Sequence, residues 1–371
     1  MTVRHTAILV LALAACSSGR TGGTGRGTGT EKADGGGTSQ SGNTDPNVDS
    51  DGDGYSPNQG DCNDSSAVIG PNSVEINGNG VDDDCDGKVD NAAACDTGIA
   101  GQKTAAAMTA AIGICATKFI TGTKFVGPSV DDGRNTFASF GSVQKLEGSA
   151  MAFMSSGSAK PGPYNPQPGT DLGQNGTTTS YMSPYAAGLA APPTNGCGNA
   201  PPDTVNDYTE LEVDLTVPYN ANSFSFQFQF FSAEYPEFVC TTFNDRFLVI
   251  VDDGKGALQQ VAFDNSKNPI SVNNGFFTIC QNDSSKPQTQ HCTQDVSKIS
   301  GTGYEQTDGF DSTPVGGSTG WLTTTVPVTP GDKIKLRFLV YDEGDSIYDS
   351  STLIDNFQWL TGAIQGPITI N

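Results

Sequence analysis

Phe224–Phe230 reads FSFQFQF, in which each phenylalanine alternates with a serine or a glutamine. Successive side chains of a β-strand point to opposite faces of the sheet, so this alternation predicts a strand with one buried aromatic face and one polar face. A strand of this kind needs a core on one side only. The stretch therefore indicates a sheet that packs one face against a hydrophobic interior.

The same period of two recurs on both sides of this stretch. Alternating runs occupy Leu211–Val217 and Ile334–Val340, whereas Phe247–Val251 (FLVIV) and Leu353–Leu360 (LIDNFQWL) are more continuously apolar. Gly, Pro, Asn and Asp residues, which favour turns, separate the runs. We therefore predict a mainly β protein: a jelly-roll-like β-sandwich over residues 124–371, preceded by a small Asp-rich calcium-binding module and one short helix.

A second informative stretch runs from Asp49 to Asp90 and opens with DSDGDGY. Between Asp45 and Asp90 there are twelve acidic residues and one basic residue, Lys88. The net charge of this segment is about half of the net charge of the whole chain, which is −22. Carboxylates at this density repel one another in a compact state, so the segment is expected to fold around cations. A solvated acidic linker is the alternative, but it needs neither regularly spaced glycines nor two cysteines.

The spacing of these acids predicts calcium ligands. Asp49, Asp51 and Asp53, followed by a glycine, match the start of an EF-hand loop, in which the next ligand is a backbone carbonyl. The match then fails, because Gly60 stands where an EF-hand has its bidentate glutamate and no amphipathic helices flank the loop. The predicted ligands of the module are Asp49, Asp51, Asp53, Tyr55, Asp61, Asp64, Asp82, Asp84, Asp86 and Asp90.

The Asp-rich stretch resembles two known kinds of sequence. It resembles thrombospondin type 3 calcium repeats, and more closely the MopE-type metal-binding motif of secreted bacterial proteins. The resemblance rests on DGDGY at Asp51–Tyr55, GDCxD at Gly60–Asp64, PxxxE at Pro71–Glu75 and DxDCDGxxD at Asp82–Asp90. The name of that family is associated with copper, but oxygen donors without His or Met suit Ca²⁺ better.

Residues 1–16 are expected to be an export signal. A short positive region precedes the apolar run Ala7–Leu13, which is too short to span a bilayer. The tetrapeptide that ends at Cys16 (LAAC) resembles the bacterial lipobox, which implies a lipidated cysteine and attachment to a membrane. An ordinary signal peptide is the alternative. Because Ser17 is not aspartate, the resemblance implies the outer membrane, with the protein exposed at the surface or facing the periplasm.

The rest of the N-terminal part divides by composition. Residues 17–46 are rich in Gly, Ser and Thr and are predicted to be a disordered tether, because they cannot bury enough apolar surface to offset the entropy of ordering. Residues 47–91 form the Asp-rich module. Residues 92–123 are an Ala-rich helical connector, with the helix expected over Ala105–Ala116.

Eight cysteines remain when Cys16 is set aside, and an even number in an exported protein suggests disulfides. Eight cysteines allow about 105 pairings, so connectivity stays open; proximity along the chain favours neighbours. A zinc site is the alternative, but no CxxC spacing occurs. The favoured pairs are Cys62 with Cys85, Cys95 with Cys115, Cys197 with Cys240 and Cys280 with Cys292.

Two acidic clusters follow directly on apolar strands of the predicted sandwich. Such positions lie at the rim, where a strand leaves the sheet, and carboxylates there can bind calcium or simply form turns and caps. A pair of carboxylates can also act as the acid and base of a glycoside hydrolase. The candidates for a second metal site are Glu234, Glu237, Asp245, Asp342, Asp345, Asp349 and Asp355.

The same region resembles the choice-of-anchor L domain, a bacterial surface module that is attached by different anchors in different proteins. The resemblance covers roughly residues 124–360 and rests on Met151–Ala159, Thr170–Leu172, Phe230–Glu237, Asn244–Phe247 and Gly344–Ser350. The segment 251–330 departs from the pattern. The resemblance implies a surface location and little about activity.

These observations favour a binding protein over an enzyme. Apart from His5 in the expected signal, the only histidine is His291, so catalysis that depends on histidine is disfavoured. A net charge of −22 excludes nucleic acid as a partner. We predict an outer-membrane lipoprotein whose sandwich binds a glycan, a matrix polymer or another cell-surface ligand. A carbohydrate-active enzyme that uses paired carboxylates is the alternative. Trp321 and Trp359, the aromatic residues best suited to a sugar platform, lie in strand-like runs and are expected to be buried.

Overall fold

The computed structural model describes residues 45–91, 94–127, 133–157, 180–192, 197, 200–273, 275–281, 292–305 and 316–371. These residues belong to one compact unit, which spans residues 43–371. The expected export signal with its lipidated Cys16, the tether up to residue 44, and His291 lie outside the described residues.

Two antiparallel sheets of seven strands form a sandwich, which confirms the predicted fold class. The first contains β1 (Ile120–Val126), β7 (Thr204–Thr216), β14 (Lys333–Asp342), β9 (Arg246–Asp252) and β10 (Leu258–Gln260) in that order, with β6 (Tyr181–Met182) and β11 (Ile270–Ser271) attached. The second contains β12 (Ile279–Cys280), β13 (Gly317–Pro327), β8 (Ser223–Ser232), β15 (Ser350–Leu360), β5 (Met151–Ser155) and β2 (Arg134–Phe137), with β16 (Ile368–Ile370) beside β13. A separate hairpin joins β3 (Ser139–Phe140) to β4 (Val143–Gln144).

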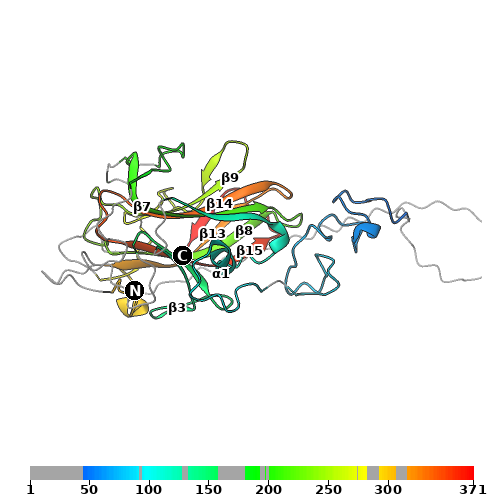
Figure 1. Ribbon diagram of the computed structural model, residues 1–371, viewed down its shortest axis with the longest axis horizontal. Coiled ribbons are helices and arrows are strands. Elements are labelled where there is room, and N and C mark those ends of the chain that lie inside the picture. Colours follow the sequence, from blue (N-terminus) through cyan, green and yellow to red (C-terminus); the bar gives the residue numbers. More distant parts are fainter. Residues whose placement is uncertain are drawn as a thin grey trace, which may run out of the picture. The chain divides into compact units, whose positions relative to one another are not determined.

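The long strands alternate between the sheets as the chain proceeds. β7, β9 and β14 lie in one layer and β8, β13 and β15 in the other (Figure 1). Neighbours within a sheet are therefore not consecutive in sequence: β8 pairs with both β13 and β15, and β14 pairs with both β7 and β9. This alternation is the connectivity expected of a jelly-roll-like sandwich. It brings strand ends that are far apart in sequence to the same rim.

The interior of the sandwich is aromatic, as the alternation at Phe224–Phe230 predicts. All four phenylalanines of that stretch are fully buried. Two of them contact the opposite sheet: Phe226 packs edge-on against Phe338 at 5.3 Å between ring centroids, and Phe228 lies 5.0 Å from Phe247. Such pairs add to the stability that simple burial of the rings supplies.

The polar face of β8 was expected to be exposed to solvent, but it is covered at one end of the strand. Gln229 is buried, and its amide nitrogen donates to the Ser318 hydroxyl at 2.8 Å. A second apolar cluster, which includes Phe153, Phe231 and Tyr304, covers the outer face there. The loops that cover this face are distant in sequence, so a local pattern could not predict them.

The Ala-rich segment contributes to the sandwich. Its helix α1 (Ala105–Ala111) starts at the Thr104 cap and ends five residues before the predicted Ala116, because Gly113 at a φ of 99° turns the chain. Met108 and Ile112 lie in the main core. Among the described residues, 3₁₀ turns also form at η1 (Pro57–Gln59), η2 (Thr117–Phe119) and η5 (Val296–Ile299).

Disulfides join the cysteines in the four pairs that proximity favours: Cys62–Cys85, Cys95–Cys115, Cys197–Cys240 and Cys280–Cys292. The first lies within the Asp-rich module, and the second ties the chain before α1 to the chain after it. Within the described part of the chain, no helix has the length and apolar character that crossing a membrane requires.

Candidate metal centres and an adjoining cavity

The first acidic loop brings three carboxylates together. One oxygen from each of Asp49, Asp51 and Asp53 lies within 4.8 Å of the others. The loop is held in this shape by backbone amides: Gly52 and Gly54 donate to Asp49 at 2.7 and 3.0 Å, and both glycines have positive φ. Since a side chain is strained in that conformation, the glycines make the close turn possible.

Two more predicted ligands lie beside this trio. Asp64 accepts hydrogen bonds from the Ser50 amide and hydroxyl at 2.8 and 2.7 Å, which places it against the loop. Asp61 is buried. One carboxylate oxygen of Asp61 and one of Asp51 have no hydrogen-bond partner. Burial raises the pKa of Asp61, and the neighbouring Asp51 carboxylate raises it further. Such a site disfavours several negative charges unless a cation is bound.

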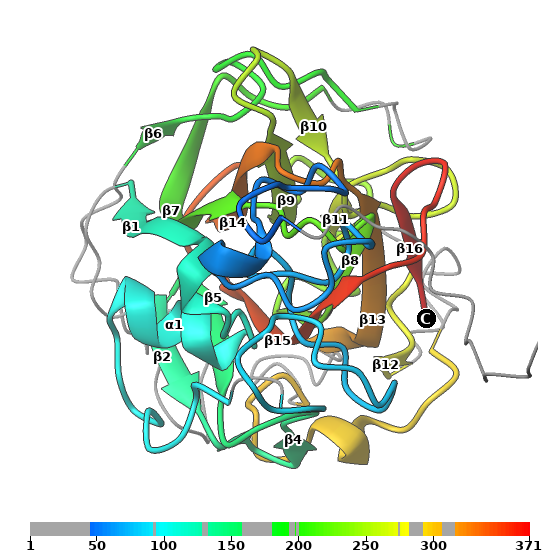
Figure 2. The same ribbon diagram turned by 90° about the vertical axis from the view of Figure 1, so that its right-hand side faces the viewer.

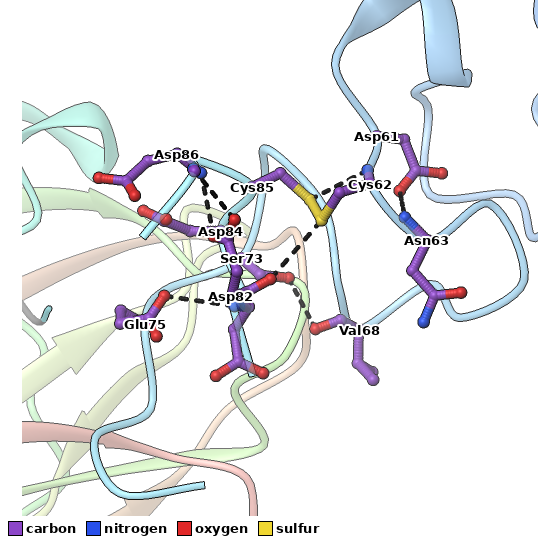
Figure 3. The surroundings of a disulfide bond; sticks show 12 residues. Asp61, Cys62, Asn63, Val68, Ser73, Glu75, Asp82, Asp84, Cys85 and Asp86 are labelled. Carbon is purple, nitrogen blue, oxygen red and sulfur yellow. Dashed lines mark hydrogen bonds between the residues drawn. A yellow bond between two sulfur atoms is a disulfide. The ribbon is translucent and has the colours of Figure 1, made fainter. Parts of the chain in front are cut away.

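The second acidic run forms another trio, from Glu75, Asp82 and Asp84, whose oxygens also lie within 4.8 Å of one another. The Cys62–Cys85 disulfide holds this run against the segment that carries Asp61 (Figure 3). Glu75 is absent from the predicted ligands, although it ends the PxxxE part of the motif. Burial raises its pKa, and one buried oxygen of Asp84 has no hydrogen-bond partner.

Other acids of the second run fold the backbone. One oxygen of Asp90 accepts from the amides of residues 78, 79 and 80, and Asp83 accepts from the Ile76 amide and the Asn79 side chain. Asp86 accepts from the Lys88 amide and from Asn91. Asp86 and Asp90 were predicted as ligands, and the structure brings neither into the trio; Asp83 instead stabilises the turn that positions Glu75.

The donor set fits a hard divalent cation. Every close donor in the two trios is a carboxylate oxygen, and both cysteines of the described module are in a disulfide. Calcium takes six to eight oxygen ligands, whereas copper prefers nitrogen or sulfur. The unpartnered buried oxygens of Asp51, Asp61 and Asp84 are where such an ion would relieve repulsion.

The module contacts the sandwich at the end where β8 begins. The Asn220 side chain accepts from the Val74 amide at 3.0 Å and donates to the Val74 carbonyl at 2.7 Å. The Tyr219 amide donates to the Asn72 carbonyl, and Lys118 forms an ion pair with Asp84 at 3.0 Å. Figure 2 looks onto this end, with residues 45–91 in blue in front of the strands. The module is thus docked through specific contacts.

A cavity of about 620 Å³ lies between the module and the sandwich. Glu75 and Asp84 line one side, and Phe357 and Trp359 of β15 line the other. Trp359 is half-buried, and its ring packs edge-on against Phe224 and Phe357. Burial of Trp359 was predicted, and it is incomplete because the strand ends here at the cavity. Trp321 is also half-buried but lines no part of this cavity.

The acids of the second predicted site gather at the opposite rim. Glu234 follows β8, Asp245 precedes β9, Asp342 ends β14 and Asp349 precedes β15, and all four are 0–2 % exposed. β8 has ten residues, so this rim is about 30 Å from the cavity. Asp207, near the start of β7, is also buried and acts electrostatically on Asp342; it was not among the acids predicted from the sequence.

The remaining candidates lie outside this group. Asp355 follows Asp349 by six residues along β15, a rise of about 20 Å, and accepts hydrogen bonds from the amides of Leu146 and Glu147. Asp345 is half-buried and acts electrostatically on Glu234, and Glu237 is half-buried in the turn after Glu234. The structure therefore brings four of the seven predicted residues together and leaves Asp355 apart.

Comparisons with known proteins agree with two of the resemblances found in the sequence, the choice-of-anchor L domain and the MopE-type motif. A family model described as "Choice-of-anchor L domain" matches residues 102–357, and one described as "Putative metal-binding motif" matches residues 61–91. The loop Asp49–Tyr55 precedes the second match. A comparison with curated proteins finds no match. A solved structure of TmCBM61 in complex with β-1,4-galactotriose is similar over 56 % of this chain and 87 % of its own, with 9 % identity and a TM-score of 0.19.

Proposed function

The chain belongs to the choice-of-anchor L domain family, and on that premise we propose that it is a cell-surface lipoprotein whose sandwich and Asp-rich module together bind an extracellular glycan. The observation that carries the proposal is the cavity between them. It combines an aromatic ring, Trp359, with carboxylates and the Lys118 ammonium group. An apolar ring beside hydrogen-bonding groups suits the face and hydroxyls of a sugar.

The module takes part in this site as one of its walls. Glu75 and Asp84 belong to the second trio and also line the cavity. Calcium would hold these side chains and the backbone around them in one arrangement. Ligand binding is therefore expected to require both the metal-bound module and the end of β15.

The alternative of a carbohydrate-active enzyme finds no support in the rim acids. Glu234, Asp245 and Asp342 are 0–2 % exposed, so a polysaccharide could not reach them as the acid and base of hydrolysis. Turnover of a polysaccharide that Glu234→Gln abolishes would contradict the binding function.

A glycan array tests the proposal, with the full chain in calcium and in chelator. Trp359→Ala is expected to weaken binding at least tenfold, because it removes the ring from the cavity. Trp321→Ala is the matched control, since it removes the same kind of side chain from outside the cavity, and it should bind like the parent. Equal loss in both variants, or binding that ignores chelator, would contradict the proposal.

Attachment to the outer membrane is tested separately. Cys16→Ser is expected to release the protein from the membrane fraction and to abolish incorporation of a labelled fatty acid. Incorporation that persists in this variant would show that Cys16 is not the lipidated residue.

A further inference from the structure

We propose that the sandwich itself holds a buried calcium ion at the rim formed by Glu234, Asp245, Asp342 and Asp349. This site is about 30 Å from the cavity and from the module, and it does not depend on the proposed ligand. Its role is to pin together four strand ends that come from both sheets.

Burial of adjacent carboxyl groups is the first argument. The side chains of these four acids are 0–2 % exposed. Glu343 is also buried here, but Arg246 neutralises it, with 2.6 Å between Nε and a carboxylate oxygen. The strongest charged neighbours of Asp342 are the carboxyl groups of Asp245, Asp349 and Asp207. Several adjacent carboxylates in a dry interior require protons or a cation.

Asp342 supplies the second argument. Its side chain is 1 % exposed, and no N–H or O–H group of the described residues donates to either of its carboxylate oxygens. Its carboxyl group lies against that of Asp245. A buried polar group without a partner is rare in proteins and destabilising, so the arrangement points to a ligand that supplies the missing contact.

Asp245 is held in a fixed orientation. Its two oxygens accept hydrogen bonds from the Glu343 amide at 3.1 Å and the Ser350 hydroxyl at 2.8 Å. Its own amide faces a Glu234 oxygen at 3.4 Å. Hydrogen bonds of this kind orient metal ligands and leave one lone pair of each oxygen for the ion.

The rim acids come from four different strand ends and not from one loop. Among the described residues, only the two trios of the module have three carboxylate oxygens mutually within 4.8 Å, so an ion at the rim would take its remaining ligands from other oxygens, such as those of water.

A proton shared between Asp245 and Asp342 is the competing way to relieve the repulsion. The two cases differ in their response to calcium. A shared proton leaves stability and ion binding unchanged when calcium is added, whereas a bound ion raises stability with calcium concentration.

The test measures bound calcium and thermal unfolding of the full chain, in chelator and in millimolar calcium. To remove the module's contribution, the six acids of its two trios are replaced by their amides. This background is expected to bind one ion per chain and to unfold at a higher temperature in calcium. Adding Asp342→Asn should abolish that ion and the calcium-dependent rise, while unfolding in chelator occurs at an equal or higher temperature because a buried charge is gone.

Glu234→Gln serves as a second variant in case Asp342→Asn does not fold, and it should lower calcium affinity at least tenfold. Asp332→Asn is the matched control, because the Asp332 side chain is 36 % exposed and pairs with Lys255 at 2.9 Å, far from the buried rim acids; it should leave both measurements unchanged. The proposal is overturned if calcium does not raise the unfolding temperature of the chain in which the six trio acids are amides, or if Asp342→Asn in that chain leaves ion binding unchanged.

Discussion

Arg246 and Glu343 form an ion pair inside the acidic rim, with both side chains less than 5 % exposed. The residues next to them in sequence, Asp245 and Asp342, face the other acids. The carboxylate of Glu343 is thus neutralised by Arg246, whereas the neighbouring Asp245 and Asp342 take part in none of the described ion pairs. Replacing one member of a buried pair leaves the other charge uncompensated.

Glu343→Gln is therefore expected to destabilise the protein by about 3–5 kcal/mol, since it leaves the Arg246 guanidinium buried without a counter-charge. Denaturant unfolding measures the change. Asp332→Asn breaks the exposed pair with Lys255 and should cost less than about 1 kcal/mol. Similar losses in the two variants would show that the rim is hydrated.

Asn220→Ala is expected to loosen the module from the sandwich. It removes two hydrogen bonds to the backbone of Val74, which is itself buried. Leaving these backbone groups unpaired should cost about 1–3 kcal/mol locally and speed hydrogen exchange around Val74. Asn222→Ala is the control, because that side chain donates to the Thr361 carbonyl and contacts no module residue through a hydrogen bond. Equal exchange in both variants would contradict the docking role of Asn220.

Chelation is expected to open residues 47–91. Without a cation the acids of each trio repel one another, so the amides of Gly52 and Gly54 should lose protection from hydrogen exchange, and small-angle scattering should show expansion. Strand interiors such as β8 should stay protected at room temperature. Replacing Asp49, Asp51 and Asp53 by asparagine should abolish the response of the first loop to chelator, because the charges that bind the cation and repel one another are gone. Unchanged protection in chelator would contradict a metal-organised module.

Asp355 is expected to make stability depend on pH. Burial raises the pKa of Asp355 to about 6 from the usual 3.8. The folded state then holds the proton of Asp355 more tightly than the unfolded state does. The stabilisation that this proton supplies is therefore fully present below pH 3.8 and is lost as pH rises through about 6. The loss is worth about 3 kcal/mol, and Asp355→Asn should remove it.

The measurement compares the variant with the parent from pH 4 to 7, and the relative stability of Asp355→Asn should rise with pH. Asp253→Asn is the control with the opposite sign, because hydrogen bonds from the Lys255 and Ala257 amides lower the pKa of that exposed acid. A stability difference between Asp355→Asn and the parent that does not change with pH would show that this carboxyl group ionises in the folded protein without destabilising it.

The alternating residues determined that β8 is a strand, and the Asp-x-Asp-x-Asp-Gly spacing determined the first trio. Both depend on neighbours within one strand or one loop, where the backbone period alone sets which side chains meet. Tertiary structure decided the rest. Glu75 joins Asp82 and Asp84, Trp359 faces the module, and four rim acids converge, because strands that pair in space are far apart in the chain. Local patterns carry no information about which strand ends share a rim, since that depends on long-range pairing and on the core that stabilises it.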